Sequence, residues 1–94
     1  MLIVSGRIYV RAGARPEFLK SSLDAIALAR RSRGCRDFVV AADPIEPDRV
    51  NVYEEWESEE ALLTFRGVGP GDELTSSIVR ADVSRHVVTS SGPP

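Results

Sequence analysis

The segment VYEEWESEEAL at residues 52–62 passes from the pattern of a strand to the pattern of a helix. Its first half is rich in β-favouring residues, which is typical of a strand. Ser58 then occupies the place of a helix N-cap, and two glutamates follow in the first turn, where the helix dipole favours negative charge. The segment therefore predicts a strand over residues 49–57 that leads directly into a helix continuing through Phe65.

A second β-rich run, residues 35–42, lies just upstream of this segment. The two runs are joined by residues 43–48, which read Asp-Pro-Ile-Glu-Pro-Asp. Two prolines in this short stretch exclude a continuing strand and are typical of a hairpin with a longer loop. We therefore expect the runs to pair as neighbouring strands.

The N-terminal part predicts one strand and one helix. Residues 2–11 alternate with period two, which indicates a half-buried strand. Pro16 suits the first turn of a helix, and Gly34 suits the position just after its end. An apolar stripe at helical spacing supports the helix; its members are Leu19, Leu23 and Ile26, with Ser22 and Ala29 between them.

The C-terminal part is interrupted by glycines at residues 67–71. We expect a short further helical stretch after this interruption, and a final strand over residues 82–89. The apolar residues expected to face inward from the short stretch are Leu74, Ile78 and Val79.

The element order β-α-β-β-α-β predicts an α+β, ferredoxin-like fold with a four-stranded antiparallel sheet and both helices on one face. The other face of the sheet then needs a partner, because the outward positions Tyr9, Phe38, Val40 and Tyr53 are apolar or aromatic. Exposed patches of this kind usually mark interfaces. We expect a homodimer formed through the sheet face, with a solvated monomeric sheet as the alternative.

Length and composition indicate one small domain, which we place at residues 1–89, followed by a flexible C-terminal tail at residues 90–94. The net charge is −2 and the basic residues are scattered, which argues against a nucleic-acid partner. No apolar run is long enough to span a bilayer, so we expect no membrane partner. The single cysteine, Cys35, fits a reducing compartment, and we expect a cytoplasmic protein.

Residues 52–62 also carry a resemblance to a known family. A strand that ends in Tyr-Glu-x-Trp-x-Ser and runs into Glu-Ala-Leu resembles the signature of the antibiotic biosynthesis monooxygenase domain. The resemblance extends over residues 2–89. Further motifs similar to that family are Ile3-Val4-Ser5-Gly6, Gly13 with Phe18, Gly34-Cys35, Asp43-Pro44 and Pro47-Asp48-Arg49.

The resemblance implies a dimeric α/β barrel, in which two ferredoxin-like sheets pack face to face. It also implies a cofactor-independent monooxygenase that oxidises an aromatic, quinol-like or polyketide-derived small molecule with dioxygen. The better-understood members need no metal, flavin or haem, so we expect no cofactor. A protein metal site is not expected on independent grounds, since one His and one Cys cannot supply a standard ligand set.

Such an oxygenation requires an apolar pocket, a basic group and a group that stabilises an oxyanion. Trp56 could flank a ring and donate its N–H, or it could be a core residue. His86, the only histidine, could act as the general base, or it could lie at the surface. Arg85 could stabilise an anion, but it has the opposite parity to His86, so only one of the two points inward without a bulge.

Two further residues complete the candidate site. Tyr53 offers a phenol for substrate binding, although a strand tyrosine also has structural reasons to be there. Glu54 shares the parity of Trp56, which distinguishes it from the neighbouring glutamates that fit a solvated surface. The candidate catalytic residues are thus His86 and Trp56, and the candidate substrate-binding residues are Trp56, Arg85, Tyr53 and Glu54.

Two other functions fit the same fold. One is a non-enzymatic dimeric α/β barrel that binds a small ligand or is associated with stress. The other is a cofactor-free isomerase of a small lactone or carbonyl compound, which needs a differently placed acid and base. The fold alone does not decide among these functions.

Overall fold

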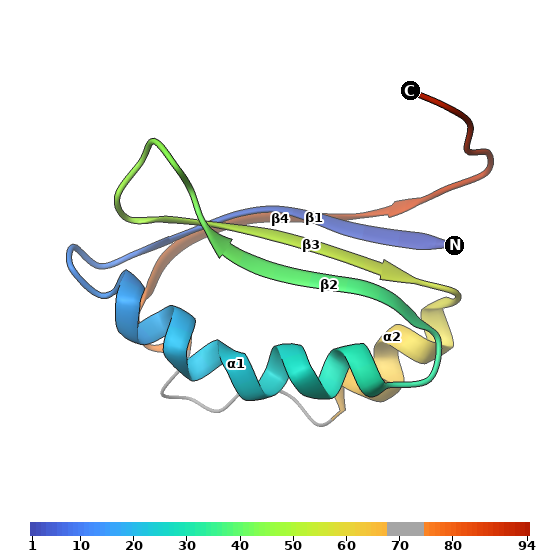
Figure 1. Ribbon diagram of the computed structural model, residues 1–94, viewed down its shortest axis with the longest axis horizontal. Helices are drawn as coiled ribbons and strands as arrows, with labels where there is room; N and C mark the ends of the chain where they lie inside the picture. Colours follow the sequence, from blue (N-terminus) through green and yellow to red (C-terminus); the bar gives the residue numbers. More distant parts are fainter. Residues whose placement is uncertain (68–74) are drawn as a thin grey trace.

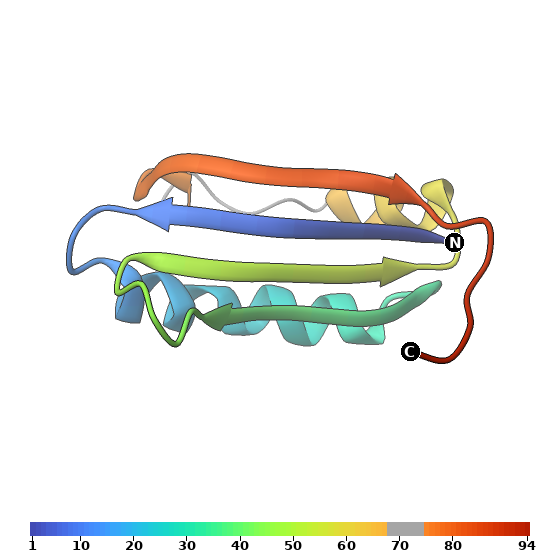
Figure 2. The ribbon, with the colours of Figure 1, turned by 90° about the horizontal axis from the view of Figure 1, so that it is seen from above.

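The computed structural model describes residues 1–67 and 75–94 (Figure 1). Within them the elements follow in the order β1 (Leu2–Val10), α1 (Arg15–Arg31), β2 (Cys35–Ala42), β3 (Arg49–Trp56), α2 (Glu59–Arg66) and β4 (Ile78–Val87). The strands pair antiparallel in the order β2-β3-β1-β4. Figure 2 shows this sheet with both helices behind it. The described residues confirm the ferredoxin-like arrangement.

The core lies between the sheet and the helices, on the side that we call the helix side. The opposite side of the sheet is called the open face. Strand alternation sends the even-numbered side chains of β1 and β3 to the helix side, where those of β3 are all buried. The two core clusters are Leu2, Val4, Ala29, Phe38, Trp56 and Leu62 near the α2 end of the sheet, and Val10, Phe18 and Val50 near the start of α1.

Helix α1 buries a stripe slightly different from the predicted one. Phe18, Ser22 and Ala29 are buried, whereas Leu23 is 62% exposed. Successive side chains of a helix point about 100° apart, so Leu23 points away from the sheet when its neighbour Ser22 faces it. The hydroxyl of buried Ser22 donates to the Phe18 carbonyl at 2.8 Å, so its burial leaves no unpaired polar atom.

The open face differs from the prediction at Phe38 and Val40, because both face the helix side. The register of β2 against β3 shifts between Cys35 and Asp37, which inserts one residue and reverses the parity that follows. Phe38 consequently lies edge-on to Trp56, with ring centroids 6.5 Å apart. Val40 packs against both core clusters. Both were wrongly assigned to the open face.

Strand β4 begins at Ile78, four positions before the predicted start, and ends at Val87 instead of residue 89. Ile78 pairs with Val10, and an irregularity in the register follows at once. Val79 is 68% exposed at this irregularity, so the prediction that Val79 faces inward from a helix is wrong. Most of the predicted glycine interruption, and Leu74, lie outside the described residues. No described helix is long and apolar enough to cross a bilayer.

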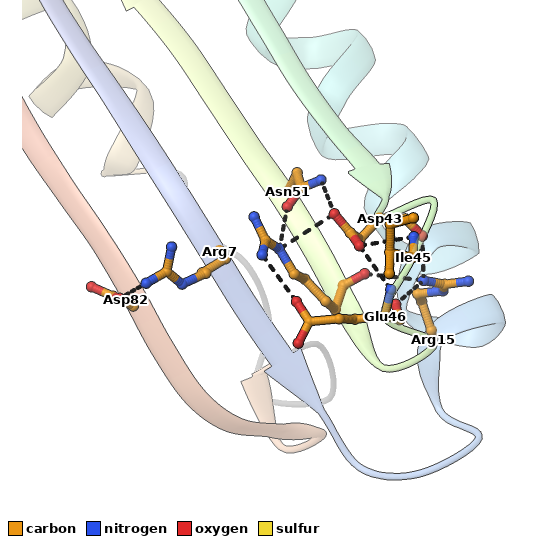
Figure 3. Close-up of polar contacts among 8 residues, drawn as sticks. Arg7, Arg15, Asp43, Ile45, Glu46, Asn51 and Asp82 are labelled. Carbon is orange, nitrogen blue, oxygen red and sulfur yellow. Dashed lines mark hydrogen bonds and ion pairs between the residues drawn. The ribbon is translucent and has the colours of Figure 1, made fainter.

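The loop between β2 and β3 is tied to the start of α1 by one arginine (Figure 3). The guanidinium of Arg15 donates to the carbonyl oxygens of Asp43, Glu46 and Arg49, at 3.1, 2.9 and 3.2 Å. Asp43 in turn accepts from the backbone N–H of Glu46 at 2.8 Å and from the Asn51 amide at 2.9 Å. The hydrogen bond from Glu46 is the main cause that lowers the pKa of Asp43 to about 2.

Candidate functional site

A buried carboxyl and the only tryptophan of the sequence form a pair on the helix side of β3. Glu54 and Trp56 point the same way because they are two residues apart in a strand. The indole Nε1 of Trp56 donates to Oε1 of Glu54 at 2.9 Å. Glu54 is 8% exposed and Trp56 has no exposed surface. The parity that the sequence predicted for this pair is confirmed.

The pKa of Glu54 is raised above its ordinary value, and burial is the main cause. The hydrogen bond from Trp56 and the positive charge of Arg66 both act in the opposite direction, since they stabilise the carboxylate. A carboxyl with a raised pKa is a stronger base when ionised than a carboxyl at the surface. Glu54 is therefore a candidate for proton transfer.

The aromatic surroundings of Trp56 hold its ring in place. Phe65 of α2 lies with its ring centroid 5.3 Å from that of Trp56, and Phe38 of β2 lies 5.5 Å from Phe65. Full burial confirms the core alternative for Trp56 within the protomer. Its polar N–H is used on Glu54, so Trp56 orients the carboxyl rather than presenting its own ring at the surface.

The neighbouring surface on the helix side belongs to β1 and β4, and we call it the β1–β4 surface (Gly6, Val83, Arg85 and Val87). Val83 is 36% exposed and Val87 is 74% exposed, so this surface is both apolar and accessible. Gly6 lies directly opposite Val83 and contributes no side chain. A Cβ at this position would lie 2.1 Å from the carbonyl oxygen of Asp82, which explains why a glycine is required.

Arg85 supplies a cation to the β1–β4 surface. It pairs with Val4, and Val4 pairs on its other side with Glu54, so the three residues form one row across the sheet on the helix side. The Arg85 guanidinium contacts Glu59 Oε1 at 3.3 Å, at the first residue of α2. The side chains of this ion pair are 44% and 61% exposed.

The structure separates the other two candidates from this row. His86 pairs with Ile3 on the open face and is exposed. Tyr53 also lies on the open face, opposite Ser5, where burial and the neighbouring charge of Glu55 raise its pKa. Trp56, Glu54 and Arg85 therefore share one side of the sheet, and His86 and Tyr53 the other. His86 as general base stays a prediction that this geometry does not favour.

One cavity formed by described residues is less suited to the predicted chemistry. A cavity of about 130 Å³ lies at the far end of the sheet, lined by Arg11, Ala14, Glu17, Phe18, Ser21, Ser76 and Ser77. Pockets for drug-sized ligands usually measure about 300 Å³ or more, so a polycyclic substrate does not fit there. Residues 1–67 and 75–94 contain no group of three or more potential ligands that could hold a metal ion.

Solved structures of low sequence identity share this fold. A proposed antibiotic biosynthesis monooxygenase from Nitrosomonas europaea has a TM-score of 0.86 at 12% identity, covering 96% of this chain and 100% of the other. A second such protein, from Caulobacter crescentus, has a TM-score of 0.83 at 19% identity, covering 95% and 90%. A third, from Deinococcus radiodurans, has a TM-score of 0.81 at 15% identity, covering 100% and 98%.

The fold and the sequence together define the family. The model of the family described as antibiotic biosynthesis monooxygenase matches residues 1–68, which is most of the chain. No curated protein matches the sequence. The chain belongs to the antibiotic biosynthesis monooxygenase family, as the residues around Trp56 indicated.

Proposed function

We propose that the protein is a cofactor-independent monooxygenase that oxidises an aromatic, quinol-like or polyketide-derived molecule with dioxygen. Family membership supports a monooxygenase-like role. The observation that carries the proposal is the buried Glu54 carboxyl, which accepts the Trp56 N–H at 2.9 Å and lies in one row across the sheet with Arg85 of the accessible β1–β4 surface. This arrangement combines a proton acceptor with a place for a flat apolar molecule.

The proposed reaction starts with proton removal. The Glu54 carboxylate accepts a proton from a phenolic hydroxyl or an activated ring methylene, and the resulting anion is electron-rich enough to reduce dioxygen. For a methylene, four electrons leave the carbon, one oxygen atom forms the new carbonyl group and the other leaves as water. For a phenol, the hydroxyl and the ring C–H that gains the oxygen atom become the two carbonyl groups of a quinone, and the second oxygen atom again leaves as water. No external reductant is then required. Arg85 lies in the same row as Glu54 and stabilises negative charge on the substrate.

We also propose that the protein is a homodimer formed through the open face. Tyr9, Tyr53 and Ile3 contribute to this face and are only partly buried in one protomer. A second copy would cover them and would raise the buried area of a domain that is small for independent stability. The dimer leaves the helix side of each protomer free for the proposed site.

The experiment is oxygen uptake by the purified protein with a panel of anthrones and hydroquinones, compared with buffer alone. The proposal predicts protein-dependent uptake and a carbonyl or quinone product with at least one panel member. Trp56→Phe supplies a second readout, because it removes the N–H that lowers the pKa of Glu54. We expect the pH at which its activity rises, as Glu54 becomes ionised, to be higher than in the wild type. An unshifted profile would contradict the assigned role of Trp56.

A further inference from the structure

We infer that the ion pair Arg85–Glu59 makes the site selective for aromatic molecules that bear a carboxylate or another anionic group. The anionic group takes the place of Glu59 on Arg85, while the ring lies on the β1–β4 surface. The inference rests on the proposed use of the helix side as the ligand site. It adds that the ligand is an anion and that Glu59 competes with it for Arg85.

The first argument is a comparison of two ion pairs with nearly equal exposure (Figure 3 shows one of them). Arg7 and Asp82 lie directly opposite each other on neighbouring strands of the open face, and they approach to 2.9 Å. Arg85 instead reaches out of the sheet to a helix and contacts Glu59 at 3.3 Å. Exposed ion pairs of this kind contribute little to stability, so the Arg85 pair can open without harm to the fold.

The second argument is the charge balance of the site. An anion that approached Glu54 without a compensating cation would be repelled. Exchange of Glu59 for a ligand carboxylate leaves Arg85 with one carboxylate partner in both states, so the charge next to Arg85 is unchanged. The released Glu59 stays favourable in the first turn of α2, where the helix dipole stabilises a negative charge.

The third argument is the spacing. Glu54 and Arg85 stand on strands that are second neighbours, separated by β1, which places their backbones roughly 10 Å apart. Val4 lies between them in the row and is only 1% exposed, so the rings do not lie along the row but on the β4 side of it, next to Arg85. The planar guanidinium of Arg85 suits bidentate binding of a carboxylate. Exposed Val83 and Val87, on the same strand and the same side, supply apolar contact for the rings.

The test uses two ligands of the same shape and different charge, 2-naphthoate and 2-naphthamide, with binding followed by calorimetry and by backbone amide shifts. The proteins are the wild type, Arg85→Gln, Glu59→Gln and the control Arg7→Gln. The control removes an arginine that has the same 44% exposure in one protomer but lies on the open face, and light scattering establishes that all four proteins have the same oligomeric state. This test needs no oxygen chemistry.

We expect wild type to bind 2-naphthoate about tenfold more tightly than 2-naphthamide, since charge-assisted hydrogen bonds are of that strength. Arg85→Gln abolishes this preference, Glu59→Gln strengthens binding of 2-naphthoate severalfold, and Arg7→Gln changes neither. The amide shifts centre on β4 and the start of α2. Equal affinity of the two ligands in wild type, binding of neither ligand, or a preference that survives Arg85→Gln would each overturn the inference.

The outcome is separable from the proposed oxygenation. Selective naphthoate binding by a protein that takes up oxygen with no panel member would leave this inference standing and would support the small-ligand-binding alternative. The opposite result is oxygen uptake that depends on Glu54 in a protein that binds 2-naphthoate and 2-naphthamide equally well. It would support the proposed oxygenation and overturn the inference about ligand charge.

Discussion

Among the glycines that the structure describes, Gly6 leaves the least space for a side chain. Its φ is +153° and the position of its missing Cβ lies 2.1 Å from the Asp82 carbonyl oxygen and 2.7 Å from the Val83 Cα. These contacts are backbone atoms of the neighbouring strand, which cannot rotate away. A glycine in the middle of a strand often signals close approach of another chain segment, and here that signal was present in the sequence.

Gly6→Ala should destabilise the protein by about 3 kcal/mol or more, because β1 and β4 must separate to admit the methyl group. The matched control is Gly13→Ala. Gly13 also has a positive φ, +79°, but nothing lies within 4 Å of its missing Cβ, so only the backbone strain of about 1–2 kcal/mol applies. Urea unfolding of both variants measures the difference. Equal losses would show that steric contact at Gly6 is not decisive.

Glu54 connects stability with pH. Burial raises the pKa of Glu54 above its ordinary value of 4.5, so the folded protein holds this proton at pH values where the unfolded chain has released it. Folding stability therefore falls as pH rises through that interval. Ionised Glu54 is therefore a cost to the fold, as the proposed role of Glu54 in proton transfer implies.

Glu54→Gln should remove this pH dependence and keep an acceptor for the Trp56 N–H. We expect the variant to be more stable than wild type near pH 8 and nearly equal to it near pH 4, where wild-type Glu54 is largely protonated. Thermal unfolding across this pH range provides the measurement. A variant less stable than wild type at all pH values would contradict the assigned desolvation.

The sequence predicted which residues of the candidate site share a side of their strand. It predicted less well which side of the sheet they face. The common parity of Glu54 and Trp56, and the opposite parity of Arg85 and His86, follow from strand alternation alone. Which member of the second pair faces the helices depends on the register Val4↔Arg85, a long-range property that a local pattern does not contain. Glu59 was read as part of a solvated surface, and its contact with Arg85 has no local signal either.

At the scale of elements, the boundaries marked by proline, glycine and capping residues were predicted closely. Ser58 accepts a hydrogen bond from the Ala61 N–H, as an N-cap should, and β2 has the predicted bounds. The errors at Phe38 and at the start of β4 both arise at irregularities in the register. A β-bulge reverses all later side chains, and the sequence of β2 does not mark its position.

The β2–β3 loop should lose stability in acid because of Asp43. Its pKa is lowered to about 2 from 3.8, chiefly by the hydrogen bond from the Glu46 N–H, so the stabilisation is present above about pH 4 and is lost as pH falls toward 2. Asp43→Asn should be less stable than wild type at pH 7 and should show a flatter dependence below pH 4. Denaturant midpoints at several pH values test this. Parallel curves for the two proteins would contradict it.

At the scale of the whole molecule, the helices cover one side of the sheet and leave the open face available, as Figure 2 shows. If two copies pack through this face, light scattering should give twice the protomer mass of 10.3 kDa. Tyr53→Glu should shift the mass to that of a monomer, because it places a charge at the centre of the face. Leu23→Glu, at a 62% exposed position on α1, should remain dimeric. A monomeric wild type would contradict the proposed assembly.

The central claim is that proton transfer takes place on the helix side of the sheet, at Glu54. The most direct measurement is the kcat of oxygen uptake for Glu54→Gln and His86→Ala with the best panel substrate. The account predicts a loss of about 100-fold or more for Glu54→Gln, the usual scale of general base catalysis, and near wild-type activity for His86→Ala. A large loss for His86→Ala together with an active Glu54→Gln would place the chemistry on the open face and contradict the account.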